Sequence, residues 1–257
     1  MKTSSTETPV TTPLKLLLMG PPGARKTTLG LQFPDVHVMD CDNNLTGPEL
    51  FLRKRGPLNY TYDSIRYNEA GAPVEIDQCY NRLCDKLRLF KQEPEYQKRR
   101  TVFVDSLSHV NEFIIRHVLK LQGKDKKSYE MEARDWSPFK SFAYMLLVAR
   151  LEETAKTVIC SCHEIKLTQN DPNNIMTQQV IGYEPFFQGK VGDTIGAFFT
   201  DVWRCEVRPG PGGKTETWLQ TMPSPKLEML KNSVGMEKEL NITEGFKVLE
   251  PYLKGRI

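Results

Sequence analysis

The sequence lacks the long apolar runs and the signal-like start that membrane insertion or secretion would require. No apolar stretch among its 257 residues approaches the length that spans a bilayer. Residues 1–13 are rich in Ser and Thr and have no apolar core, so we expect a flexible tail there rather than a signal peptide. Strong charge is also missing, because the formal net charge of +3 permits a nucleic-acid partner without indicating one. We therefore expect a cytoplasmic protein that does not associate with membranes.

Cysteine pairs with C-x-x-C spacing are absent as well. The six cysteines are scattered without C-x-x-C spacing, which is typical of reduced thiols in a cytosol. Cys160, Cys162 and His163 could suggest a metal site, but they fall on a stretch that predicts a buried strand, and no second cluster accompanies them. We therefore expect no zinc site.

What the sequence does contain is a glycine-rich turn between a strand-like apolar run and a helix-like segment. Residues 15–28 read KLLLMGPPGARKTT, which fits the pattern G-x-x-x-x-G-K-[ST] except at one position. Such a turn points successive backbone N–H groups into one concavity that binds phosphate, while Lys26 adds charge at the β- and γ-phosphates and Thr27 a hydroxyl for Mg²⁺. A chance glycine-rich turn is the alternative. The predicted nucleotide-binding residues are Gly20, Pro21, Pro22, Gly23, Ala24, Arg25, Lys26, Thr27 and Thr28.

Arg25 is the position that departs from this pattern, since the last glycine belongs there. If the turn needs a glycine-like backbone at this point, a side chain costs on the order of 1 kcal/mol. If it does not, the guanidinium either points to solvent or adds charge near the phosphates. We expect Arg25 to leave ATP binding intact and to affect the rate of hydrolysis more than the binding.

Strand-like and helix-like segments alternate, which predicts one α/β domain with a mostly parallel, doubly wound sheet. Apolar runs predict strands at 14–19, 36–39, 101–104 and 157–162, with a short one near 64–67, and helical spacing marks 26–32, 74–91, 107–121 and 137–149. Residues 123–135 and 166–195 are polar and predict two long loops. Alternation at 198–207 and 215–221 predicts an antiparallel edge hairpin. The core is expected to span 14–232, followed by a C-terminal helical segment at 233–257 with its helix at 240–253.

Polar residues of the right chemistry close the predicted strands, and ligands collect at the carboxyl ends of such strands. Asp105 follows four apolar or β-branched residues, which indicates a carboxylate that supports Mg²⁺; a turn aspartate is the alternative. Asp42 is a candidate to orient or deprotonate the attacking water, or else an Asx-type cap. His163 could sense the γ-phosphate, or be a structural histidine. With Lys26, these are the catalytic and metal residues that we expect within the chain itself.

In this order, three segments after the turn resemble the RecA-type ATPase core: Val38–Asp42, Val102–Ser106 and Val158–His163. The resemblance covers roughly residues 14–232 and is closest to compact phage RecA-like single-strand annealing proteins of the Sak type, within a phage AAA NTP-binding family. In those proteins a His-Glu pair, a Pro…Gly-Lys segment and an Asp-Val-x-Arg strand follow, as they do here at 163–164, 185–190 and 201–204. Arg25 and Asp42, which stands where the family has glutamate, depart from the pattern.

The resemblance implies a homo-oligomer, a ring or a filament, that hydrolyses ATP at subunit interfaces. In such assemblies a neighbouring subunit inserts a Lys or Arg at the γ-phosphate, where it supplies charge to the transition state. Lys214, on the glycine-rich hairpin, is the first candidate, and Lys190, Arg204 and Arg208 are others. For each of them a solvated surface cation is the alternative.

The two long loops occupy the places where RecA-like proteins line a DNA channel. Cations neutralise phosphates, and aromatic rings stack on unpaired bases with little sequence preference. A charged loop and a partly buried aromatic cluster are the alternatives. The expected DNA-binding residues are Lys124, Lys126, Lys127, Arg134, Lys166, Tyr183, Phe186, Phe187 and Lys190.

Together these features predict an ATP- and Mg²⁺-dependent recombination protein of phage type that binds single-stranded DNA and promotes annealing or strand exchange. Its expected partners are single-stranded DNA, further copies of itself and a single-strand DNA-binding protein, in the host cytoplasm. Two other functions remain open. One is a nucleotide-dependent switch that binds protein partners, and the other is an assembly unit that binds NTP and scarcely hydrolyses it.

Overall fold

The computed structural model describes residues 13–124, 130–171 and 174–257. The tail predicted at 1–13 therefore lies outside the described residues, apart from Pro13. The strands are β1 (Lys15–Gly20), β2 (Val36–Asp40), β3 (Tyr60–Ser64), β4 (Thr101–Asp105), β5 (Thr157–Asp171), β6 (Asn174–Pro185), β7 (Asp201–Pro209), β8 (Thr215–Gln220) and β9 (Glu239–Asn241). The helices are α1 (Lys26–Gly30), α2 (Thr46–Arg53), α3 (Cys79–Gln92), α4 (Pro94–Gln97), α5 (Leu107–Leu121), α6 (Trp136–Tyr144), α7 (Leu151–Glu153), α8 (Gly189–Thr194) and α9 (Glu250–Leu253).

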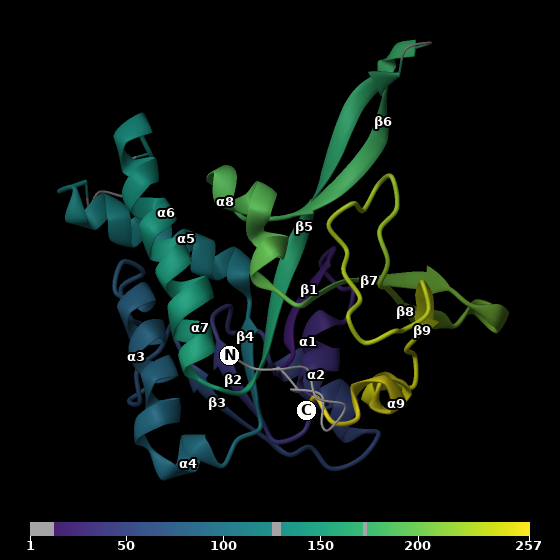
Figure 1. The fold of residues 1–257 in the computed structure, drawn as a ribbon, viewed down its shortest axis with the longest axis horizontal. Helices are drawn as coiled ribbons and strands as arrows, with labels where there is room; N and C mark the ends of the chain where they lie inside the picture. The colour runs from purple at the N-terminus through teal and green to yellow at the C-terminus, as the bar shows by residue number, and fades with distance from the viewer. Residues whose placement is uncertain (1–12, 125–129, 172–173) are drawn as a thin grey trace, which may run out of the picture.

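Within the described chain the strands form one sheet in the order β3-β2-β4-β5-β1-β7-β8-β9, with β6 paired to β5 outside this path (Figure 1). The pairs from β3 to β7 are parallel, whereas β7–β8 and β8–β9 are antiparallel. The predicted α/β class, a mostly parallel sheet with an antiparallel edge, is confirmed. Because β5 lies between β1 and β4, the glycine-rich turn after β1 and the carboxylate at the end of β4 are two strands apart on the same edge.

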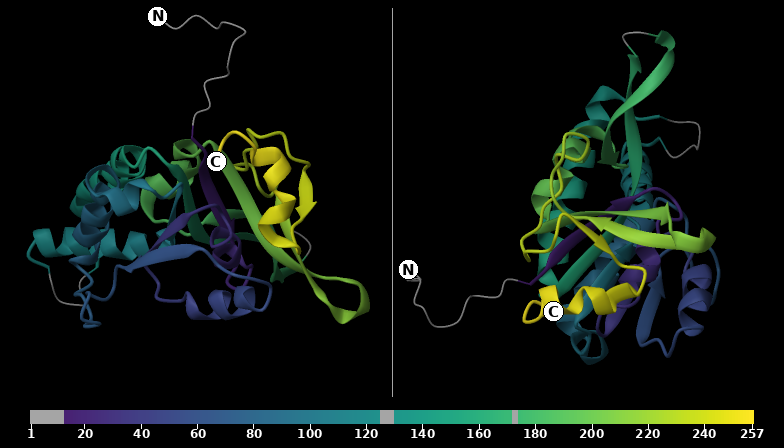
Figure 2. Two further views of the ribbon diagram at one scale, coloured as in Figure 1. Left: turned by 90° about the horizontal axis from the view of Figure 1, so that it is seen from below. Right: turned by 90° about the vertical axis from the view of Figure 1, so that its right-hand side faces the viewer.

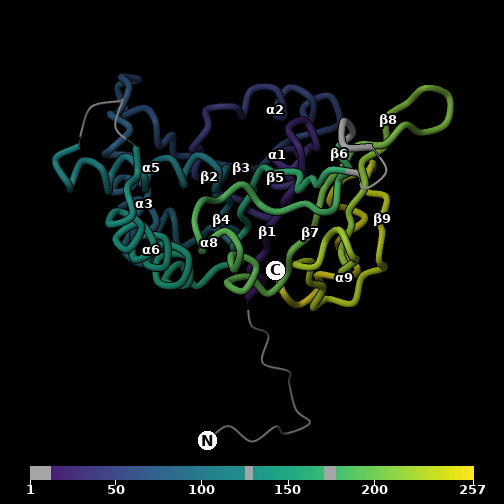
Figure 3. The backbone as a smooth tube through the Cα atoms, turned by 90° about the horizontal axis from the view of Figure 1, so that it is seen from above, coloured from purple at the N-terminus to yellow at the C-terminus, as the bar shows by residue number. Residues whose placement is uncertain are grey.

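Alternating side chains of the central strands supply two hydrophobic layers. Leu17 and Met19 of β1 pack in one cluster with apolar residues of α3, α5 and α6. Leu16 and Leu18 face the opposite cluster, which includes residues of α1, α2 and the C-terminal segment. Each of these β1 side chains is fully buried, which stabilises the fold by about 2 kcal/mol per residue. The sheet is therefore a middle layer between two helical layers (Figure 3).

The second predicted loop, at 166–195, is wrong over most of its length, because parts of β5, β6 and α8 occupy it. Residues up to Asp171 continue β5, and β6 returns antiparallel to it, so that a long β-hairpin projects from the body (Figures 1 and 2). Thr168, Gln169 and Asn170 are exposed because the projecting ribbon has no helical layer over it. Because neither face of the ribbon buries many side chains, its sequence shows no clear alternation of apolar and polar residues. A polar sequence without such alternation predicts a loop.

The helix expected at 240–253 is also wrong. The segment contributes β9, then a single 3₁₀ turn at Gly245–Val248 and the short α9. Gly245 has φ +82°, a left-handed conformation that interrupts a continuous helix. The helical spacing of apolar residues is nevertheless explained, because Phe246 packs on Phe33 with ring centroids 4.6 Å apart. The segment thus seals the second hydrophobic layer of the core.

Smaller boundary shifts occur elsewhere. The helix expected from residue 74 begins at Cys79, and the short strand expected near 64–67 is β3 at Tyr60–Ser64. None of the helices in the described ranges is long and apolar enough to cross a membrane.

Candidate nucleotide-binding site

The turn after β1 is built on two glycines. A Cβ on Gly20 would lie 2.3 Å from the carbonyl oxygen of Cys205 on the neighbouring β7, which no side chain can accommodate. Gly23 has φ +78°, in the left-handed region that favours glycine. These two positions fix the curvature that leads from the strand into α1.

The Lys26 side chain lies inside the turn and bonds to its backbone. Its Nζ donates hydrogen bonds to the carbonyl oxygens of Gly20 and Pro21, both at 2.9 Å. The side chain is buried, and this burial lowers the pKa of Lys26 despite nearby acidic groups that act in the opposite direction. The ammonium is thus held inside the turn, where a phosphate cradled by the loop would meet it.

Arg25 adopts the glycine-like backbone that its position requires, with φ 63° and ψ 27°. A non-glycine residue in this left-handed region costs about 1 kcal/mol. Its guanidinium donates to the hydroxyls of Thr217 and Thr215 on β8, at 3.1 Å each, and lies 5.0 Å from the ring centroid of Phe51 on α2. The side chain therefore ties the loop to the edge of the sheet and points neither to free solvent nor to the inside of the turn.

Thr27 and Asp105 meet across the cavity. The Thr27 hydroxyl donates to Oδ2 of Asp105 at 2.7 Å, and the hydroxyl of Ser161 on β5 donates to Oδ1. Burial raises the pKa of Asp105 to about 6, a shift that these two hydrogen bonds and Lys26 partly oppose. Hydroxyl and carboxylate oxygens are the hard ligands that Mg²⁺ prefers, so this donor set fits the predicted metal.

Two carboxyl groups close β2 at the same edge. Burial, together with the nearby charges of Asp42 and Asp105, raises the pKa of Asp40 to about 7, against a hydrogen bond from the Asn43 N–H (2.8 Å). Burial also raises the pKa of Asp42, whose Oδ1 accepts the Asn44 N–H at 3.1 Å. Asp42 therefore makes the Asx-type contact that was the structural alternative for this residue. It also lines the cavity, as its expected role towards water requires. A carboxylate of raised pKa is a better base towards water.

His163 follows Ser161 on the same face of β5 and pairs in register with Gly20. Its Nδ1 is buried and has no hydrogen-bond partner within the described part of the chain. Burial lowers the pKa of His163, and the charges of Lys26 and His109 lower it further, so the ring is neutral at pH 7. A neutral imidazole can donate one hydrogen bond and accept another.

These side chains surround one cavity of about 710 Å³. It brings together most of the predicted loop, from Pro22 to Thr28, with the predicted Asp42, Asp105 and His163. Further residues that line the cavity were not among the predicted site residues; they are Asn43, Asn44, Gly47, Pro48, Phe51, Ser106, His109 and Ser161. Of these, Ser161 had a detectable signal: it lies two residues before His163 on one strand, so both face the same side.

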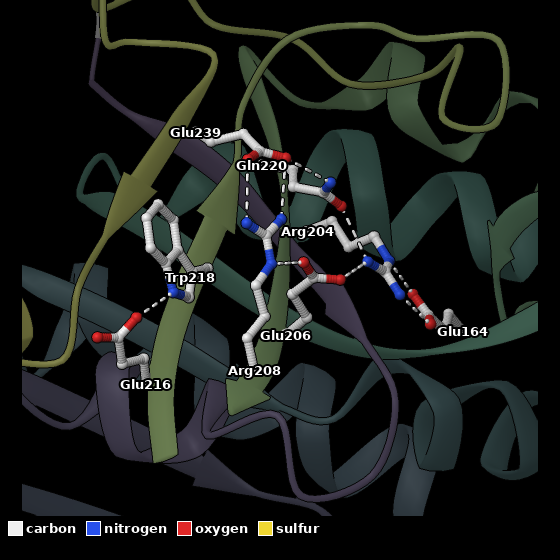
Figure 4. Close-up of polar contacts among 8 residues, drawn as sticks. All are labelled: Glu164, Arg204, Glu206, Arg208, Glu216, Trp218, Gln220 and Glu239. Atoms are coloured by element: carbon white, nitrogen blue, oxygen red, sulfur yellow. Dashed lines mark hydrogen bonds and ion pairs between the residues drawn. The ribbon is translucent and has the colours of Figure 1, made fainter. Parts of the chain in front are cut away.

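The candidate cations for a neighbouring site separate into two groups. Arg204 donates to both carboxylate oxygens of Glu164 at 2.7 and 2.8 Å, and both side chains are buried (Figure 4). Arg208 pairs with Glu239 at 2.9 and 3.0 Å and also with Glu206, which links the two arginines (Figure 4). Both arginines are thus committed to an internal ion network, which argues against a role at a neighbouring subunit.

The other two cations are exposed. Lys214 lies at the tip of the β7–β8 hairpin and Lys190 in the first turn of α8, and neither forms an ion pair within the described ranges. The β7–β8 hairpin and the β5–β6 ribbon project from the body in different directions (Figures 1 and 2). Of the four candidate cations, Lys214 and Lys190 are therefore the two that the structure leaves exposed.

Some of the expected DNA-binding residues require correction. Lys124 is buried against Asp135, with Nζ 2.8 Å from its carboxylate, so it closes its own loop. Phe187 lies in the hydrophobic core, 5.9 Å from the ring of Phe139. Tyr183 is half-buried, with the Arg204 guanidinium 4.3 Å from its ring centroid.

The remaining expected DNA-binding residues are accessible where they are described. Arg134, Lys166, Phe186 and Lys190 are exposed, and Arg134 contacts the exposed Glu132 at 3.3 Å. Lys126 and Lys127 lie outside the described residues.

Comparisons with known proteins place this site in a family. The AAA domain model matches residues 12–228. Among solved structures, the chain is similar to a KaiC-like protein from Pyrococcus horikoshii OT3, with 12% identity, coverage of 89% of each chain and a TM-score of 0.42. It is also similar to the flagellar accessory protein FlaH from Methanocaldococcus jannaschii, with 13% identity, coverage of 90% of this chain and 85% of that one, and a TM-score of 0.38.

These structural similarities are too low to extend to function, and no match to a curated protein was found. The family match stands on its own, since it spans most of the chain and contains the whole phosphate loop together with Asp42, Asp105 and His163. The chain belongs to the AAA domain family of P-loop ATPases.

Proposed function

We propose that this protein is an ATP-dependent recombination protein of phage type, which binds single-stranded DNA, promotes annealing or strand exchange, and hydrolyses ATP at subunit interfaces. The observation that carries the ATPase part is the 2.7 Å hydrogen bond between Thr27 and Asp105 inside the phosphate-loop cavity. It brings the two oxygen donors of a Mg²⁺–triphosphate site together, although they are 78 positions apart in the sequence.

Each side chain then has a role in hydrolysis. The loop N–H groups and Lys26 hold the β- and γ-phosphates, and Thr27 and Asp105 hold Mg²⁺, which neutralises charge on the phosphate oxygens. Asp42 orients the attacking water and accepts its proton. His163, neutral and with a free ring nitrogen, hydrogen-bonds the γ-phosphate, and Lys214 of a neighbouring copy adds transition-state charge.

The DNA-binding part is supported by how the β5–β6 hairpin begins. This ribbon starts directly after His163, so the strand that reports on the phosphate also carries the exposed Lys166. Lys190 and Arg134 are exposed on neighbouring segments, and Phe186 presents a ring that is 39% exposed. These cations and this ring have the chemistry to bind a flexible, single-stranded backbone and its bases.

A titration with labelled single-stranded DNA, with and without ATP, tests the proposal. Three phosphate contacts, from Lys166, Lys190 and Arg134, predict that log K falls with log salt with a slope of about −2. Absent or salt-insensitive binding would instead favour the nucleotide-dependent switch that binds protein partners. Tight ATP binding with phosphate release at background rate would favour the alternative function, an assembly unit that scarcely hydrolyses ATP. Arg25 and Asp42, which both depart from the pattern of RecA-type ATPases, are in keeping with that alternative.

A further inference from the structure

A second cavity, also of about 710 Å³, lies directly beside the nucleotide cavity. His109 of α5 and His163 of β5 line both, so these two rings form a shared wall. The other lining residues come from α5, from residues 130–131, from the start of α6 and from the segment between β6 and α8. Its size falls in the range of small-ligand sites.

Part of the lining of this cavity is apolar and aromatic. Trp136 and Phe186 line it with Met131 and Ile115. The Trp136 ring is held edge-on against Phe139, with centroids 5.5 Å apart, and the Phe186 backbone is fixed by a 2.7 Å hydrogen bond from its N–H to the His163 carbonyl oxygen. A rigid backbone thus presents an exposed aromatic ring, an arrangement that suits a flat aromatic ligand.

The rest of the lining is polar and carries more negative than positive charge. Glu112 and Glu130 are exposed carboxylates, and Arg116 is the cationic residue among the lining groups. A phosphate would meet two carboxylates there, so this cavity does not suit the backbone of a nucleic acid. Carboxylates do accept hydrogen bonds from exocyclic amino groups, as from N4 of cytosine.

We propose that this cavity binds one unpaired nucleobase with an exocyclic amino group, such as cytosine or adenine, from a single strand of DNA. The base stacks on Phe186 and Trp136 and donates its amino group to Glu112. Through the shared histidine wall, occupancy of the base site changes the packing around His163, and so couples the strand to the phosphate end of the nucleotide cavity. This inference rests on the proposed function, because it names what part of the DNA enters which site.

The test compares strands that differ only in their bases. The full-length protein with ATP is titrated with equal lengths of dC, dA and dT homopolymers and of an abasic deoxyribose-phosphate strand. Stacking of one base predicts that dC and dA bind the wild type about 10-fold more tightly than the abasic strand, and that Phe186→Ala removes most of this ratio. Glu112→Gln is expected to bring dC and dA towards dT. Ile181→Ala, an exposed apolar residue of β6 outside the cavity, is the matched control and leaves all ratios unchanged.

Tryptophan fluorescence gives an independent reading. We expect dC to quench the emission of the wild type and not of Trp136→Phe, which keeps an aromatic ring in place. Equal binding of base-bearing and abasic strands would overturn the base site and leave DNA binding intact. No binding of any strand would overturn both proposals. If the emission is quenched in the absence of DNA, and increasingly so at higher protein concentration, then a side chain of a second copy occupies the cavity. That result would overturn the base site.

Discussion

The guanidinium of Arg25 is bonded to the hydroxyl of Thr217, 192 positions later in the chain, at 3.1 Å. The phosphate loop is thereby tied to β8, the strand that follows the hairpin tip bearing Lys214. Arg25 makes this contact from a left-handed backbone that glycine would take without cost. Arg25 therefore has a strained backbone, and its side chain connects the phosphate loop to the edge of the sheet.

Two substitutions at this position separate the strain from the contact. Arg25→Gly and Arg25→Ala both remove the guanidinium, but only alanine keeps a Cβ at φ 63°. We expect Arg25→Gly to unfold with a free energy about 1 kcal/mol larger than Arg25→Ala in urea titrations. Thr217→Val, which removes one acceptor and leaves the loop backbone untouched, isolates the contact. Equal stability of the two Arg25 variants would show that the loop tolerates a side chain without strain. In ATPase assays we expect Arg25→Gly to turn over faster than the wild type.

Lys26 and Asp42 should separate binding from chemistry. Lys26→Ala removes the buried ammonium inside the turn, and we expect no measurable ATP binding by calorimetry. Asp42→Ala leaves the loop intact, so we expect ATP affinity within a few-fold of the wild type and a turnover lower by about 100-fold or more. Asp42→Asn, which keeps the shape and the Asn44 contact, serves as the control for folding. Hydrolysis by Asp42→Ala at the wild-type rate would show that another group positions the water.

The elements around this site could be predicted because their residues carry strong local constraints. Gly20 and Gly23 have backbone requirements that few sequences meet by chance, and the apolar run before Asp105 is buried on both faces in a parallel sheet. Asp42 and His163 could be placed because parallel strands bring their carboxyl ends to one edge. For these residues, sequence order and strand direction suffice.

The remaining features depend on partners that the sequence does not reveal. Nothing local distinguishes Arg204, bonded to Glu164 forty positions away, from an exposed cation, and the same holds for Lys124 in its pair with Asp135. Phe187 and Phe186 are adjacent and identical in type, yet Phe187 lies in the core and Phe186 is exposed. The β5–β6 ribbon was missed for a related reason, because a ribbon without a covering layer needs no apolar alternation.

Lys214 offers a test of action between subunits. If it serves the site of a neighbouring copy, Lys214→Ala should bind ATP normally and hydrolyse it about 10³-fold more slowly. Mixing it with Lys26→Ala, which has a dead site and an intact Lys214, should then restore activity. With random assembly, about a quarter of the interfaces combine an intact loop with an intact lysine. Lys190→Ala is the matched exposed control. A mixture no more active than its parts would show that Lys214 does not act across the interface.

The carboxylate of Asp63 on β3 should make the free energy of unfolding depend on pH in the acid range. Burial by itself raises the pKa of Asp63, but hydrogen bonds from His37 (3.1 Å), Lys86 (2.8 Å) and Tyr96 (2.6 Å) outweigh it and hold the pKa well below its usual range. The ionised form is therefore favoured in the folded state. Its contribution is fully present above the ordinary pKa near 4 and is lost as the pH falls below that value towards the folded-state pKa.

Asp63→Asn should remove this contribution. We expect the variant to be less stable than the wild type by about 2 kcal/mol at pH 7, because charge-assisted hydrogen bonds are replaced by neutral ones. The difference should shrink as the pH falls from 4 to 2, where the wild-type carboxylate becomes protonated in the unfolded chain. Urea midpoints at pH 7, 4 and 2 measure it. Asp85→Asn is the control, since Asp85 pairs with Arg88 on the exposed face of α3 and a surface pair contributes about 0.5 kcal/mol or less. A difference between Asp63→Asn and the wild type that stays constant over this range would mean that the polar contacts of Asp63, and not its charge, stabilise the sheet edge.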